Sequence, residues 1–153
     1  MVLTVRSEFN GSHQVGDFRW MIEQPEYADA LFIFNDNQSQ FYEHQESIGT
    51  DHRCVPGGGN ATIRPYQCAT PPQATGIPTG EFGGYSALDD SSRAAIDDAI
   101  AYFESLLATG DYARVIYSWD AQSQTLGTGI FTVAREVTDY IVERIDTTAA
   151  RYS

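Results

Sequence analysis

The sequence contains no lysine: all nine basic residues are arginine, against 21 acidic residues, and the formal net charge is −12. This composition argues against binding of extended nucleic acids, because that requires a basic face that displaces counterions. It argues equally against an anionic membrane surface. Arginine in place of lysine is typical of GC-rich genomes, such as those of actinobacteria and their phages, so we expect a bacterial or phage-encoded protein.

Cysteines are scarce, and long apolar runs are absent. Cys54 and Cys68 are too few for a disulfide framework. No run approaches the ~18 apolar residues of a membrane span, and the first residues have no apolar signal core. We therefore expect a cytoplasmic protein with free thiols and no membrane partner.

The remaining composition is that of a folded domain. The chain has 153 residues, 42% of them hydrophobic. A chain of this length buries about 70% of its unfolded surface, which is enough for a core. The sequence predicts one domain over residues 1–153.

Strands and helices can be placed in the first and last thirds of the chain. Residues 2–9 alternate as in a strand, and the wholly apolar run Leu31–Phe34 fits a strand buried on both faces. Residues 38–89 hold five of the six prolines and are expected to be rich in loops, with a short helix at 39–48. The final third predicts a helix capped within 89–92 and stopped by Gly110, a strand at 113–117, and a last helix capped by Thr132. This order predicts an α/β fold with a mixed sheet flanked by helices.

Two glycine-rich segments are candidate binding loops. They are Gly57–Ala61 and Gly127–Phe131, and the second precedes the last predicted helix. Successive backbone N–H groups in such loops bind anions, and a helix N-terminus adds partial positive charge. Neither segment matches a P-loop or the GxGxxG pattern. Each can also be an ordinary tight turn.

Taken in order, four motifs resemble those of the macro domain family, which binds ADP-ribose and related nucleotides. They are Gly16-Asp17-Phe18, Asn35-Asp36-Asn37 after the buried strand, Gly57-Gly58-Gly59 and Thr128-Gly129-Ile130-Phe131. The resemblance covers most of the chain. It implies a single macro-like three-layer α/β domain.

The resemblance also implies a role for each motif. Asp17 would accept a hydrogen bond from the adenine amino group, and Asn35 and Asn37 would bind the distal ribose. The two glycine-rich loops would enclose the diphosphate and the distal ribose. The implied ligand-binding residues are Asp17, Phe18, Asn35, Asn37, Gly57, Gly58, Gly59, Asn60, Ala61, Arg64, Gly127, Thr128, Gly129, Ile130 and Phe131.

Hydrolysis of an ADP-ribosyl group is the alternative activity. Hydrolases of this family carry an aspartate just after the glycines, where this chain has Ala61, and the preceding Asn60 cannot ionise to act as a general base. Residues 118–124 also look inserted before the second loop. We assign no catalytic residue. A third hypothesis is an interaction protein whose glycine loops are simple turns.

Other candidate residues leave alternatives open. Arg64 could clamp a phosphate or form a structural ion pair. Phe82 could stack on a base or anchor its loop in the core. A zinc site formed by His44, His52, Cys54 and Cys68 is a weak alternative, because only the His52-Arg53-Cys54 element resembles that of some macro domains. We predict no metal and no cofactor, and a small nucleotide as the partner.

Overall fold

The sheet of this protein is mostly parallel. A computed structural model describes residues 1–50 and 52–153. The strands are β1 (Leu3–Ser7), β2 (Ala30–Asn37), β3 (Ala74–Gly80), β4 (Arg114–Asp120) and β5 (Thr125–Leu126). Their order is β1-β4-β2-β3, with parallel neighbours, and β5 pairs antiparallel with β4. The predicted mixed sheet is confirmed.

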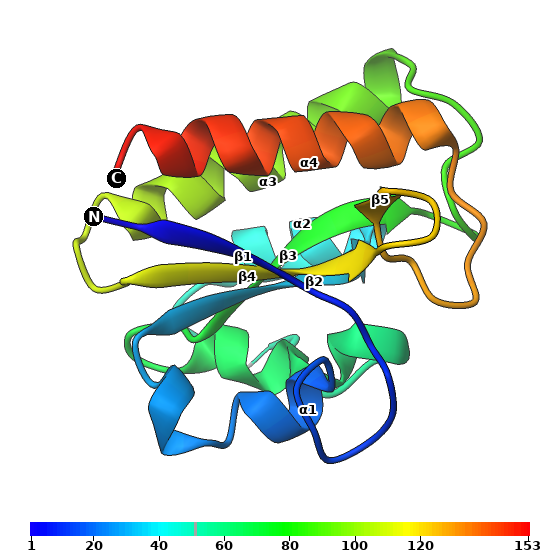
Figure 1. The fold of residues 1–153 in the computed structure, drawn as a ribbon. Helices are drawn as coiled ribbons and strands as arrows, with labels where there is room; N and C mark the ends of the chain where they lie inside the picture. Colours follow the sequence, from blue (N-terminus) through cyan, green and yellow to red (C-terminus); the bar gives the residue numbers. More distant parts are fainter. Residues whose placement is uncertain (51) are drawn as a thin grey trace.

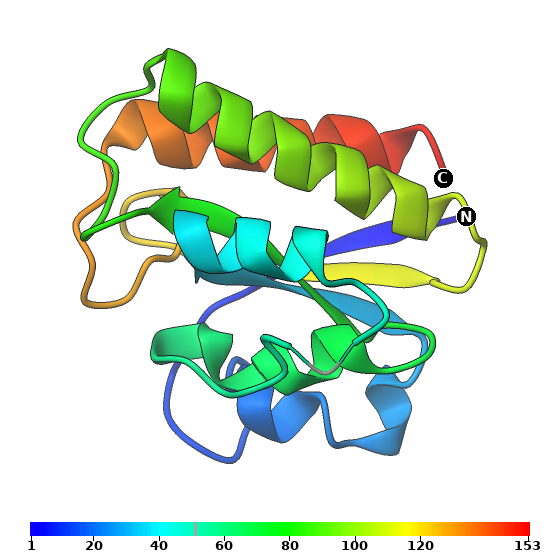
Figure 2. The same cartoon turned by 180° about the vertical axis from the view of Figure 1, so that it is seen from behind.

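Helices flank this sheet. α3 (Asp90–Leu107) and α4 (Arg135–Ala150) cover one face, while α1 (Phe18–Met21) and the 3₁₀ helices η1 (Pro25–Tyr27) and η2 (Gly59–Cys68) lie on the other (Figure 1). α2 (Gln38–Glu46) packs beside β3, as seen from behind (Figure 2). The α/β class predicted from the order of elements is therefore confirmed.

β2 forms the centre of the hydrophobic core because both of its faces are buried. Leu31 and Ile33 belong to the cluster under α3 and α4, and Phe32 and Phe34 belong to the cluster that contains α1. Side chains alternate between the two faces of a strand, so a wholly apolar run is what a sheet covered on both sides requires. The prediction of a buried strand at Leu31–Phe34 is confirmed.

β3 lies inside the segment that we expected to be rich in loops. All seven of its residues are buried, although it contains two glycines and Pro78. Among the described strands, β3 neighbours β2 alone, apart from a bridge from Gly80 to Gly84, so Pro78 needs no ladder partner on its outer side. Gly76 leaves room for a carboxylate, because a Cβ there would lie 2.6 Å from Asp36 Oδ2. Because of its glycines and proline, this strand could not be predicted from hydrophobic periodicity.

The two long helices differ in how they begin. α3 starts with a capping box between Asp89 and Ser92, and a glycine at position 110 (φ +80°) follows its end, as predicted. The prediction that Thr132 caps the last helix is wrong: α4 begins at Arg135, and its N-cap residue Ala134 makes no side-chain cap hydrogen bond. Residues 132–134 instead lie beside the segment that follows β3, where the Ala134 N–H donates to the Tyr85 carbonyl oxygen (2.9 Å).

Candidate functional site

A cleft of about 620 Å³ opens where the parallel strands end. Its wall includes the last residue of β1, Ser7, the end of β2 from Asn35 to Asn37, Thr79 and Gly80 of β3, and the end of β4 from Ser118 to Asp120. Ligands of open parallel sheets bind in such a crevice at the carboxyl ends of the strands. All fifteen predicted binding residues line this cleft except Gly57 and Ile130.

The first glycine-rich loop forms one wall of the cleft and begins η2. The Gly57 N–H donates to Ala61 O (3.0 Å), and the Ala61 N–H donates to Gly58 O (3.1 Å). Gly59 has a φ of +59°, a conformation that glycine adopts without penalty. The first N–H groups of a helix have no acceptor within the helix, so the start of η2 offers donors at the cleft wall.

Arg64 anchors this loop through a buried ion pair. Its Nη2 donates to Asp36 Oδ1 (2.8 Å) and to Gln40 Oε1 (2.9 Å), and both charged side chains are almost fully buried. A Cβ on Gly57 would lie 2.7 Å from Arg64 Nη1, which explains the glycine there. Of the two roles considered for Arg64, the structural ion pair is the one observed.

Asp36 is a residue of the cleft wall that sequence reasoning did not select. Burial raises the pKa of its carboxyl group, while the neighbouring Arg64 guanidinium opposes that rise. Within the residues that the structure describes, Asp36 Oδ2 and Arg64 Nε have no hydrogen-bond partner. The signal in the sequence was a charged residue that continues a buried apolar strand.

The predicted ribose-binding asparagines connect neighbouring segments. The Asn35 N–H donates to Asn60 Oδ1 (2.8 Å), and Asn35 Nδ2 donates to Gly127 O (2.9 Å), so Asn35 joins the two glycine-rich loops. Asn37 is the N-cap of α2: its Oδ1 accepts from the N–H groups of Ser39 and Gln40. The side chain of Asn37 is therefore already engaged in holding α2.

The second glycine-rich loop is more exposed than the first. Gly129 has a φ of +62°, the Phe131 N–H donates to Thr128 O (3.2 Å), and the Gly127 N–H donates to Ser118 O (3.0 Å). Phe131 lines the cleft, whereas Ile130 is 94% exposed and lies outside it. Because α4 begins only at Arg135, the expected helix terminus does not directly follow this loop.

Asp17 and Phe18 lie at the start of α1, in a segment near the N-terminus that also lines the cleft. Asp17 Oδ2 accepts from the His13 N–H (2.8 Å). The Phe18 side chain packs edge-on against Phe32 in the core, with ring centroids 5.2 Å apart. Gly16 allows this arrangement, since a Cβ there would lie 2.0 Å from the Glu8 carbonyl oxygen.

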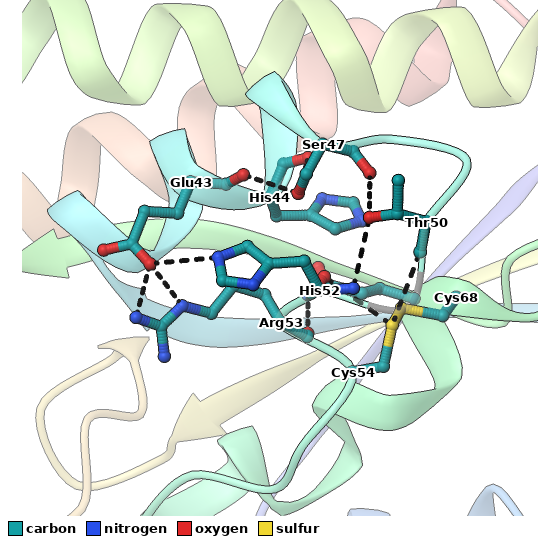
Figure 3. Close-up of a disulfide and its surroundings, with 9 residues drawn as sticks. Glu43, His44, Ser47, Thr50, His52, Arg53, Cys54 and Cys68 are labelled. Carbon is teal, nitrogen blue, oxygen red and sulfur yellow. Dashed lines mark hydrogen bonds and ion pairs between the residues drawn. A yellow bond between two sulfur atoms is a disulfide. The ribbon is translucent and has the colours of Figure 1, made fainter.

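The expectation of free thiols is wrong, because Cys54 and Cys68 form a disulfide (Figure 3). Both sulfur atoms of the proposed zinc set are thus bonded to each other. Its two histidines lie near the disulfide but have other surroundings: His52 Nε2 is 3.4 Å from Glu43 Oε2, and His44 is buried in α2. Two cysteines 14 residues apart allow a single pairing, but composition alone could not decide whether it forms. Disulfides are uncommon in the cytosol, so this pair does not favour the predicted cytoplasmic location.

Exposed aromatic and acidic side chains surround the cleft. Phe82 is fully exposed beside it, so it does not anchor its loop in the core. Further wall residues that we did not predict are Glu8, Phe9, Arg19, Glu81, Trp119 and Asp120. Trp119 and Asp120 end β4, Glu8 and Glu81 directly follow strands, and Arg19 lies in α1, so these positions meet only in the folded sheet.

Comparison with known proteins provides no relative: no family model, curated protein or solved structure matches the chain. In residues 1–50 and 52–153, no group of three or more His, Cys, Asp or Glu side chains is arranged to hold a metal ion. No helix in that described part is long and apolar enough to cross a membrane. The site is therefore interpreted from its own chemistry.

Proposed function

We propose that this chain binds ADP-ribose or a related adenine nucleotide in the cleft, as a macro-like domain that reads or sequesters the nucleotide. One observation carries the proposal: four motifs that are far apart in the sequence line a single cleft at the carboxyl ends of the strands. A volume of about 620 Å³ is in the usual range for small-molecule sites.

Backbone donors would hold the diphosphate. The first N–H groups of η2, at Gly59 and Asn60, belong to one wall, and the turn at Thr128 and Gly129 belongs to another. Backbone N–H groups bind phosphate without adding formal charge. This matters here because Arg64 already pairs with Asp36 and so is not free to neutralise a phosphate.

Asp17 would bind the adenine amino group. Its carboxylate accepts one hydrogen bond from the His13 N–H. An ionised carboxylate has about four acceptor sites, so capacity remains for an exocyclic amine. The His13 contact would orient the group before the ligand arrives.

Binding without turnover fits the residues after the glycines. The place of the family's catalytic aspartate holds Ala61, which is 3% exposed and packs in the core beside α1. The nearest buried carboxylate, Asp36, is paired with Arg64. General-base hydrolysis in the manner of the family would need a free carboxylate at the position of Ala61.

The charge of the wall favours nucleotides with few negative charges. Four wall carboxylates, those of Glu8, Asp17, Glu81 and Asp120, face a single further cation, Arg19, beyond the Asp36–Arg64 pair. Salt screens repulsion between these carboxylates and an anionic ligand. We expect affinity for ADP-ribose to rise with ionic strength and to exceed the affinity for ATP.

Calorimetric titration with ADP-ribose tests the proposal. Gly129→Glu should abolish binding, because it places a carboxylate beside the diphosphate, while circular dichroism shows an intact fold. Ile130→Glu is the matched control: it adds the same charge one residue away, outside the cleft, and should change affinity less than about threefold. Absence of heat with wild type at millimolar ADP-ribose, or equal affinities for both variants, would refute it. Release of ADP-ribose from a modified substrate would instead support the hydrolase.

A further inference from the structure

The disulfide closes a covalent loop around the chain segment that contains the first glycine-rich loop. Cys54 and Cys68 are 14 residues apart, and the segment between them contains the Gly57–Asn60 loop and nearly all of η2. Cys68 is the last residue of η2, and Cys54 lies just before the loop. The disulfide therefore links the residues just before the Gly57–Asn60 loop to the last residue of η2.

Other ties on the Cys54 side of the loop are weak. Val55 is 56% exposed. Arg53 pairs with Glu43, but both side chains are partly exposed, and such pairs contribute little to stability. Among the described residues, Gln67 Nε2 also donates a hydrogen bond to Arg53 O (2.8 Å). Figure 3 shows the Arg53–Glu43 pair beside the disulfide.

We propose that the Cys54–Cys68 disulfide is a redox-sensitive lock on this wall, so that its reduction loosens the Gly57–Asn60 loop and weakens ligand binding. Both cysteines are only partly buried, so a thiol reductant can reach the bond. The inference rests on the proposed function for its effect on affinity. The effect on the loop itself does not depend on any ligand.

The chemistry is thiol–disulfide exchange with a dithiol. One thiolate of the reductant attacks a sulfur of the bridge, forms a mixed disulfide and releases the other cysteine as a thiolate, which takes up a proton. The second thiol of the reductant then displaces the remaining cysteine. Two electrons pass to the protein, which gains two thiols, and the reductant becomes a cyclic disulfide. A small-molecule disulfide reverses the reaction.

Hydrogen exchange of the loop tests the lock without a ligand. In oxidised protein, dithiothreitol should raise amide exchange at residues 55–61 at least about tenfold at short labelling times, before the amides of β4 and α3, which exchange through global unfolding, have exchanged. The Cys54→Ser/Cys68→Ser double variant should exchange at the reduced rate whether or not dithiothreitol is present. Equal exchange before and after reduction would overturn the proposal, as would two free thiols in protein purified without reductant. If the double variant does not fold, the reduced wild type, checked by circular dichroism, gives the same comparison.

Affinity for ADP-ribose provides the second measurement. Reduction should weaken binding at least about fivefold, and reoxidation with oxidised glutathione should restore it. Unchanged affinity in spite of faster loop exchange would overturn the link between the lock and binding. If neither form binds ADP-ribose, the proposed function fails, while the exchange data still decide whether the disulfide orders the loop.

Discussion

The two glycine-rich loops face the same cleft but are anchored in different ways. The Gly57–Asn60 loop begins η2, is backed by the buried Asp36–Arg64 pair and is closed by the disulfide. The Gly127–Phe131 loop is held by backbone hydrogen bonds and by side-chain hydrogen bonds, among them the one from Asn35, and it ends in exposed side chains. Glycine content indicates a close backbone approach in both loops. It does not indicate what holds the loop in place.

The largest effect is expected from breaking the anchor of the first loop. Arg64→Ala leaves the Asp36 carboxylate buried without its partner, which should lower the free energy of unfolding by about 3–5 kcal/mol. Arg135→Ala is the matched control: its pair with Asp139 is exposed, so the loss should stay below about 1 kcal/mol. Urea denaturation measures both. Similar losses would show that the buried pair is not a special anchor.

Loss of the disulfide should come next. Removing a cross-link that closes 14 residues costs about 3 kcal/mol in the chain-entropy model, because the unfolded chain gains freedom. Thermal unfolding with and without dithiothreitol measures the change. The Cys54→Ser/Cys68→Ser variant must show no response to dithiothreitol, or the effect has another origin.

A smaller loss of stability is expected at Gly84, which packs against Thr132, the residue that follows the second loop. A Cβ on Gly84 would lie 2.0 Å from the Thr132 carbonyl oxygen, so Gly84→Ala should cost about 1–3 kcal/mol through displacement of the backbone. Gly58→Ala in the first loop is its control, since nothing lies within 4 Å of a Cβ there. Denaturant midpoints of the two variants should therefore differ. Equal midpoints would mean that the Thr132 carbonyl group is not packed tightly against Gly84.

The smallest expected effect is a pH dependence of the stability of the protein that arises from His44. Burial lowers the pKa of His44, in α2 near the disulfide, below 6.5. The folded state therefore binds fewer protons than the unfolded chain, and this contribution to stability is present above pH 6.5 and is lost as the pH falls through the lowered value. His44→Gln should remove this loss between pH 7 and pH 5. His13→Gln, in an exposed loop, should leave it unchanged.

Much of the fold could be predicted because hydrophobic periodicity acts locally. The apolar run in β2 predicted a strand buried on both faces, and the stripe from Ile96 to Leu107 predicted α3 with its cap. β3 was not predicted because it contains glycines and a proline, which are there for tertiary reasons. Gly76 makes room for Asp36, and Pro78 is compatible with a strand at the edge of the sheet. Such residues carry no periodic signal.

The candidate site was predictable in its loops and not in its side-chain partners. Glycine and asparagine clusters marked the segments that now line the cleft. The Asp36–Arg64 pair joins residues 28 positions apart, and the disulfide joins cysteines 14 positions apart. A charged side chain in a sequence does not reveal whether folding will bury it beside an opposite charge.

By itself, the sequence determined the α/β class, the apolar faces of the principal elements and the glycine positions where the backbone must approach closely, because each follows from local sterics and burial. Only the tertiary structure decided that Arg64 is an anchor, that the cysteines are paired and that the last helix begins after residues 132–134. Those outcomes depend on which distant groups the packed sheet brings within a few ångströms of one another.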